Sequence, residues 1–135
     1  MPGVFTKLNL KNEKEILVLD APDSFLAELK ALEGVKVVRS LGDTRQFSFA
    51  LVFVTERTVV DRVSKALAAK AVGDAILWFA YPKGTSKRLK CDFNRDNGWD
   101  AIRGAGWDTV RQVAIDEDWS ALRFRREEFI NHRAR

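Results

Sequence analysis

Cysteine and histidine are scarce in this sequence of 135 residues. Cys91 is the only cysteine and His132 the only histidine. A single cysteine excludes both an internal disulfide framework and a cysteine-rich zinc site. His132 is close to the C-terminal end, so no imidazole is placed to activate Cys91 as a nucleophile. Chemistry that depends on an interior histidine or on a reactive thiol is therefore not expected.

Long apolar runs and a strong charge of one sign are also missing. The longest apolar run, 75–81, is far below the roughly 20 residues that span a bilayer, and the N-terminal residues lack a signal-peptide pattern. The 23 Lys and Arg residues against 19 Asp and Glu give a net charge of +4. This mild excess permits an anionic partner but is too small to favour nucleic acid. We predict a cytoplasmic protein without a membrane partner, and leave its oligomeric state open.

The apolar content is high enough for one well-packed core. Hydrophobic residues make up 46% of the chain, including nine Phe and four Trp, which excludes a disordered protein. At this length a single core is the default. No low-complexity tract, repeat or linker interrupts the chain. We therefore predict one α/β domain over 1–135, with a charged tail at about 127–135 that frays.

Continuous apolar runs predict the centre of a sheet. The runs at 16–19, 47–54 and 75–80 have the length of strands buried on both faces, as in a parallel sheet covered by helices. A shorter run at 35–38 predicts another strand. Between the runs at 16–19 and 35–38, Pro22 suits the first turn of a helix. This helix carries Phe25 and Leu29 on its buried side and ends before Gly34. This strand–helix–strand unit predicts a right-handed parallel crossover.

The second half of the chain continues the alternation and then closes with a hairpin. Thr55 or Thr58 caps a helix that ends at a turn containing Gly73, and residues 81–93 follow as a loop. Asn94 caps a third helix that ends at Gly104. Strands at 110–115 and 119–125 are joined by the tight turn 116–118.

The predicted order is strand, helix, two strands, helix, strand, helix and two strands. This order implies a three-layer, Rossmann-like α/β fold with a mostly parallel sheet and a C-terminal antiparallel hairpin. It corresponds to a compact methyltransferase-like topology. One crossover helix is missing, because only the short polar segment 40–46 joins the strands at 35–38 and 47–54.

Three segments together resemble a known family. They are LVLDAP at 17–22, YPKGTSK at 81–87 followed by DFNRD at 92–96, and VAIDEDWSALRFR at 113–125. They resemble DUF3052, a family of small bacterial proteins catalogued as a domain of unknown function. The resemblance spans about 15–126 and implies a Rossmann-like fold and a bacterial source. The family brings no established activity, so it assigns no catalytic residue.

The candidate site lies where the strands end. Ligands of open parallel sheets bind beyond the carboxyl ends of the strands, and the hairpin turn should reach the same rim. The cationic Gly-Thr-Ser turn at 83–87 offers N–H groups, hydroxyls and charge to an anion, although a solvated loop explains the same residues. The predicted site comprises Asp20, Arg57, Tyr81, Lys83, Thr85, Ser86, Lys87, Arg95, Asp116 and Trp119.

The carboxylates and tryptophans of this region have simpler explanations than metal or base binding. Asp116 and its neighbours in the hairpin turn are typical turn formers, so no metal is predicted. Arg95 is expected to pair with Asp92 or with an acid of the hairpin and so to hold the loop. Four Trp in a small α/β core are more typical of packing than of stacking on bases.

The turn after the first strand argues against a nucleotide cofactor. Sites for dinucleotides or S-adenosylmethionine need glycines there, whereas residues 20–24 contain none. Pro22 lacks an N–H, and Asp23 would repel a phosphate. No cofactor is predicted. We interpret the protein as a non-catalytic binding or regulatory module, with a degenerate cofactor site, for a small anionic or nucleotide-like ligand. The alternative is a divergent transferase or a metal-assisted hydrolase that acts on a phosphorylated small molecule.

Overall fold

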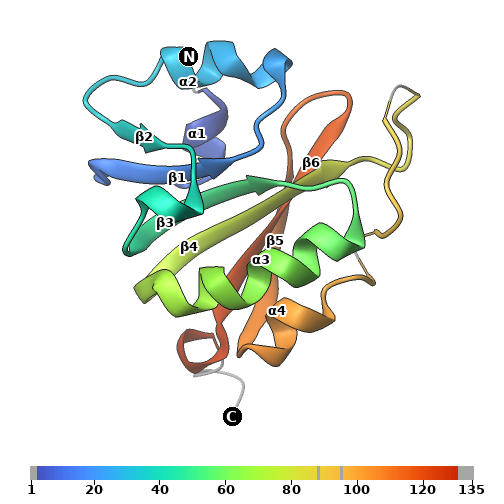
Figure 1. Ribbon diagram of the computed structural model, residues 1–135. Coiled ribbons are helices and arrows are strands. Elements are labelled where there is room, and N and C mark those ends of the chain that lie inside the picture. Colours follow the sequence, from blue (N-terminus) through green and yellow to red (C-terminus); the bar gives the residue numbers. More distant parts are fainter. Residues whose placement is uncertain (1–2, 88, 95, 131–135) are drawn as a thin grey trace.

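A single six-stranded sheet organises the protein. The computed structural model describes residues 3–87, 89–94 and 96–130. The strands are β1 (Glu15–Leu19), β2 (Lys36–Val38), β3 (Phe47–Phe53), β4 (Ala71–Pro82), β5 (Trp107–Ala114) and β6 (Trp119–Arg126). They lie in the order β2-β1-β3-β4-β6-β5 (Figure 1). β1 to β4 are parallel, and β6 runs antiparallel to both of its neighbours. The Rossmann-like fold with a closing antiparallel hairpin is therefore confirmed.

Helices cover both faces of the sheet. They are α1 (Val4–Lys7), α2 (Leu26–Lys30), α3 (Arg57–Lys70) and α4 (Asp100–Gly104), with 3-10 turns at Asp23–Phe25, Leu41–Asp43 and Glu127–Phe129. Residues of α3 and α4, such as Leu67 and Ile102, pack into one core cluster, on what we call the α3 face. Residues of α1 and α2, such as Phe5 and Leu29, pack into the other cluster, on what we call the α1 face. No helix in the described part of the chain is both long and apolar enough to cross a membrane.

The central strands are those with continuous apolar runs. Val18 of β1, Leu51 of β3 and Trp78 of β4 are completely buried. Such residues face helices on either side of the sheet, so alternation of polar and apolar residues is lost. The predicted central positions of 16–19, 47–54 and 75–80, and the antiparallel strand at 119–125, are confirmed.

Strand β4 is longer at both ends than the sequence predicted. α3 ends at Lys70 and β4 begins at once, so the expected turn at Gly73 lies inside the strand as a bulge. The pairing with β3 jumps from Ala71 to Ile76, and Gly73 has φ 55°, which suits a residue without a side chain. At the other end, Tyr81 belongs to the strand and not to a loop, because it pairs with β6.

Two predicted helices are shorter than expected. The segment after Pro22 forms a 3-10 turn followed by only five residues of α2. α4 begins at Asp100, well after Asn94. The Asn94 side chain instead accepts the N–H groups of Asp96 and Asn97, so it caps a turn and not a helix.

Both ends of the chain contribute more structure than the sequence indicated. Near the N-terminal end the chain forms α1, and the Leu8 carbonyl that follows α1 accepts the indole N–H of Trp78 at 2.8 Å. In the tail, where fraying was predicted, Glu127–Phe129 is a 3-10 turn whose first N–H bonds to the Gly106 carbonyl at 2.9 Å. Residues 131–135 of that tail lie outside the described residues.

The connection between β2 and β3 contains only a 3-10 turn, as expected. It crosses the α3 face, where Leu41 packs against the core cluster. The Lys70 ammonium at the end of α3 donates hydrogen bonds to the carbonyls of Leu41 and Thr44. A side chain from α3 therefore anchors the segment that replaces a crossover helix.

Candidate ligand site at the carboxyl rim of the sheet

A hollow of about 540 Å³ opens at the carboxyl end of β4. We call it the rim hollow; it is lined by Tyr81, Lys83, Gly84, Thr85, Asn94, Asp96, Gln112 and Ser120. A neighbouring hollow of about 360 Å³ shares Tyr81, Lys83, Gly84 and Asn94 and extends toward Cys91. Strand β4, the hairpin and the loop that follows β4 thus meet where the fold class places ligands.

A polar network forms one wall of the rim hollow. The Gln112 side chain on β5 donates to the Tyr81 hydroxyl at 2.9 Å and to the Ser120 hydroxyl at 3.1 Å. Tyr81 is only 4% exposed, and its ring packs against Phe93 and Trp99. The network therefore presents hydroxyl and amide groups on a rigid aromatic base.

The turn after β4 is tied to the hairpin. The N–H of Lys83 donates to the Asp118 carbonyl at 2.8 Å, and the Ser86 hydroxyl donates to the Asp118 carboxylate at the same distance. The Ser86 hydroxyl also accepts the N–H of Leu89. Ser86 thus stabilises the loop. Lys83 and Thr85 line the rim hollow, whereas the exposed Lys87 does not.

Two predicted site residues stabilise the hairpin. The Asp116 carboxylate accepts the N–H groups of Asp118 and Trp119, both at 2.8 Å, and so closes the turn. Trp119 is 6% exposed and packs edge-on against Phe53, with ring centres 5.1 Å apart. Neither residue lines the rim hollow.

The remaining predicted residues lie elsewhere on the rim. Asp20 follows β1 with φ 56° and is exposed. The backbone N–H of Arg57 donates to the Asp92 carboxylate at 2.7 Å, which caps α3, and its guanidinium is 3.6 Å from Asp100. Arg95 lies outside the described residues, so its expected ion pair is not seen here. The structure thus brings together Tyr81, Lys83 and Thr85, with Ser86 in the adjoining hollow.

The sequence missed Asn94, Gln112 and Ser120 as members of this site. The sequence carried little signal for Gln112, which follows the charged Arg111 in β5. No sequence feature places it against Tyr81, which is 31 positions away.

Cys91 lines the hollow that adjoins the rim hollow. Burial raises the pKa of the Cys91 thiol, so the less nucleophilic protonated form prevails at neutral pH. Within residues 3–87, 89–94 and 96–130, no three His, Cys, Asp or Glu side chains gather closely enough to hold a metal ion.

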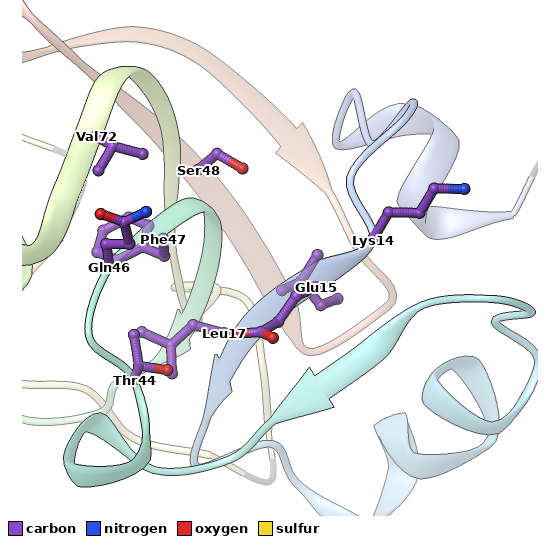
Figure 2. A pocket seen from close by; sticks show the side chains of 9 residues that line it. Lys14, Glu15, Leu17, Thr44, Gln46, Phe47, Ser48 and Val72 are labelled. Atoms are coloured by element: carbon purple, nitrogen blue, oxygen red, sulfur yellow. The ribbon is translucent and has the colours of Figure 1, made fainter.

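A separate hollow of about 250 Å³ lies at the opposite, amino edge of the sheet. Figure 2 shows side chains of β1, of β3 and of the connection that precedes β3 around it, among them Glu15, Thr44 and Phe47. The Thr44 hydroxyl is buried and has no hydrogen-bond partner among the described residues. This hollow lies beside the connection that takes the place of a crossover helix.

Comparisons with known proteins bear on the fold. No family model matches the sequence, and no curated protein matches it. A methyltransferase from Aquifex aeolicus described as SAM dependent has a TM-score of 0.61 at 12% identity, over 90% of this chain and 87% of that chain. The N-methyltransferase NodS from Bradyrhizobium japonicum has a TM-score of 0.56 at 12% identity, over 91% and 92%. The fibrillarin pre-rRNA processing protein of Methanococcus jannaschii has 0.55 at 10%, over 87% and 68%.

These likenesses cover nearly the whole chain at very low identity. They establish that the chain shares the fold of these solved structures, two of which are described as methyltransferases. Function is determined by the site residues and not by the fold.

Proposed function

We propose that this protein binds a small anionic ligand in the rim hollow and acts as a binding or regulatory module. The observation that carries the proposal is the meeting of Lys83 with the Tyr81–Gln112–Ser120 network in one hollow. The lysine supplies positive charge, and the hydroxyl of Thr85, which lines the same hollow, can donate a directional hydrogen bond. Phosphorylated or carboxylated small molecules need both.

The segment between β1 and α2 supports a degenerate cofactor site. The residue after β1 has a left-handed backbone conformation, but it is Asp20 and not glycine. Its side-chain carboxylate therefore occupies the position where a cofactor site of this fold has a glycine without a side chain. Pro22 precedes the 3-10 turn and has no N–H, and Asp23 places a second carboxylate in its first turn. These groups disfavour the close approach of a nucleotide phosphate.

A divergent transferase is the second candidate, and the fold likeness favours it. The Aquifex aeolicus neighbour is described as SAM dependent. Calorimetric titration of this protein with S-adenosylmethionine separates the two candidates, since a transferase that uses this cofactor must bind it. We expect weak binding or none, and micromolar affinity at the end of β1 would contradict the degenerate-site reading.

The anion proposal is tested by thermal unfolding with defined probes. Inorganic phosphate and adenosine monophosphate are titrated against chloride at matched ionic strength, because multivalent anions stabilise most folds by exclusion. A bound probe at a hundredfold excess over Kd adds about 2.7 kcal/mol to stability. We expect Lys83→Ala combined with Lys87→Ala to lose the added stability of adenosine monophosphate.

The matched control removes two exposed lysines away from the rim. Lys11→Ala with Lys65→Ala changes the net charge equally, so it should keep the response to the probe. An equal response in the rim variant and the wild type would show that Lys83 binds no anion. The rim loop would then be an ordinary solvated surface.

A further inference from the structure

Two arginines face each other across the hairpin, on the side of the sheet opposite to the rim network. Arg123 of β6 pairs with Arg111 of β5 on one side and with Trp78 of β4 on the other. Trp78 belongs to the core cluster of the α1 face, so this row of side chains lies on that face. Directly opposed like charges on paired strands destabilise a sheet. A negative charge near both arginines would reduce this repulsion.

The acidic residues of these three strands already have partners. Asp74 of β4 accepts two hydrogen bonds from Arg125, at 2.8 and 2.5 Å. Asp108 of β5 is paired with Arg103. Within the described part of the chain, Arg111 and Arg123 form no ion pair. Asp74 lies near enough to attract Arg123, but its carboxylate is already bonded to Arg125, so neither Arg111 nor Arg123 has an ionic contact of its own among the described residues.

Burial makes the missing counter-charge more significant. Arg123 is half-buried, and its buried Nε has no hydrogen-bond partner among the described residues. Burial, with the nearby charges of Arg125 and Arg111, lowers the pKa of Arg123 from the ordinary arginine value, and the Asp74 carboxylate offsets only part of this effect. A further cation, Lys7 of α1, donates to the carbonyl of Ala114 at the end of β5. Positive charge thus accumulates on one part of the α1 face.

We infer that Arg111 and Arg123 form a binding site for a phosphoryl group on the α1 face of the hairpin. The guanidinium fork presents parallel N–H donors that match the spacing of phosphate oxygens, and two such groups in register surround one anion from two strands. The anion supplies the counter-charge that the strands lack.

This site is independent of the rim hollow. Gln112 lies next to Arg111 in β5, and its side chain reaches Tyr81 in the core cluster of the α3 face. Successive side chains of a strand point to opposite faces. The two sites are therefore separated by the sheet, and loss of one leaves the other intact.

The test uses Arg111→Gln, because Arg111 is exposed and its replacement leaves the core unchanged. Inorganic phosphate is titrated against chloride at matched ionic strength, and the NMR signals of the arginine Nε–H groups are followed. We expect the Arg123 signal to shift on phosphate addition in the wild type. Loss of one charge-assisted partner should weaken this phosphate affinity about tenfold or more. Lys65→Gln, with the same change in net charge, should keep it.

A second measurement removes any dependence on the ligand. In dilute chloride, Arg111→Gln should melt at the same temperature as Lys65→Gln or above it, because the substitution relieves like-charge repulsion. A lower melting temperature would show that Arg111 has an attractive partner within the chain, which would overturn the inference. An unchanged phosphate affinity in Arg111→Gln would overturn it as well.

A third arm identifies the source of the phosphoryl group. A labelled single-stranded oligonucleotide is added to wild type and Arg111→Gln, and binding is followed by fluorescence anisotropy. A response to inorganic phosphate alone identifies a free or small-molecule phosphate. Loss of oligonucleotide affinity in Arg111→Gln identifies a phosphodiester backbone and supports the same site. If neither probe distinguishes the variant from the wild type, the inference fails.

Discussion

Replacing Thr44 by valine should make the protein more stable. Thr44 is 4% exposed, and its hydroxyl has no hydrogen-bond partner among the described residues. Its backbone is extended, with φ −118° and ψ 127°, a conformation that valine adopts readily. The bonds from Lys70 reach backbone carbonyls and not the hydroxyl, so the substitution leaves them in place.

The expected gain follows from the burial of the hydroxyl. A buried polar group without a partner costs about 1 to 3 kcal/mol, and the valine methyl has nearly the same volume. We expect Thr44→Val to raise the free energy of unfolding by about 1 to 2 kcal/mol. For a domain of this size, that corresponds to a rise in Tm of about 3 to 7 °C.

Urea unfolding followed by tryptophan fluorescence measures the effect. The midpoint should rise while the slope stays constant, because the surface exposed on unfolding is unchanged. Thr58→Val is the control, since Thr58 is exposed on α3 and its hydroxyl is free to meet water. A lower midpoint for Thr44→Val would refute the reasoning, because it would mean that the hydroxyl makes a stabilising bond.

Two further substitutions test the loop before α4 and the ion pair of β4. Gly98→Ala should destabilise the fold by about 2 to 3 kcal/mol in urea, because Gly98 has φ 95° and an added Cβ would lie 2.5 Å from the Cβ of Phe93. Gly104→Ala meets no atom within 4 Å and should stay within about 0.5 kcal/mol of the wild type; equal losses would contradict this account. Arg125 lowers the pKa of Asp74 from its ordinary value of 3.8, mainly through its side-chain hydrogen bonds. The ionised carboxylate therefore contributes its full stabilisation above that pH. This contribution is lost as the pH falls through the folded-state pKa of Asp74. Asp74→Asn should therefore flatten the acid limb of stability measured by urea midpoints between pH 5 and 2, and an unchanged limb would show that the ion pair adds nothing.

The centre of the sheet was predictable because strands buried on both faces are continuous runs of apolar residues in the sequence. The runs at 16–19, 47–54 and 75–80 have no polar alternation to obscure them, and the tight turn at 116–118 fixes the hairpin. These features predict which strands are central and that the chain closes with an antiparallel hairpin, whereas the strand order comes from the structure.

The ends of the elements were less predictable, because tertiary contacts determine them. Gly73 followed by Asp74 reads as a turn between helix and strand, yet pairing of Ala71 with Phe47 continues the strand through both residues. Asn94 has the side chain of a helix cap, yet it bonds to Asp96 and Asn97 and so closes a turn. In each case the local sequence is compatible with both structures, turn or strand at 73–74 and helix cap or turn cap at Asn94. Tertiary packing determines which of them forms.

The candidate site was predictable only as a location. The rule that ligands bind beyond parallel strands placed Tyr81, Lys83 and Thr85 at the right edge. The rule did not distinguish them from Asp116, which lies on the same edge but closes a turn. Their partner Gln112 comes from a different strand, and contacts of that kind depend on register, which the sequence alone does not specify.

The place of β6 in the sheet has a consequence for synthesis on the ribosome. Its residue Arg123 pairs with Trp78 of β4, so β4, which is buried throughout 75–82, lacks its second neighbour until the hairpin has been made. That neighbour is about 45 residues further along, and translation at about 5 to 20 residues per second delays it by about 2 to 9 s. During this interval β4 is a long exposed sheet edge, which favours pairing with other chains. The growing chain is therefore most prone to aggregate between the synthesis of β4 and that of β6.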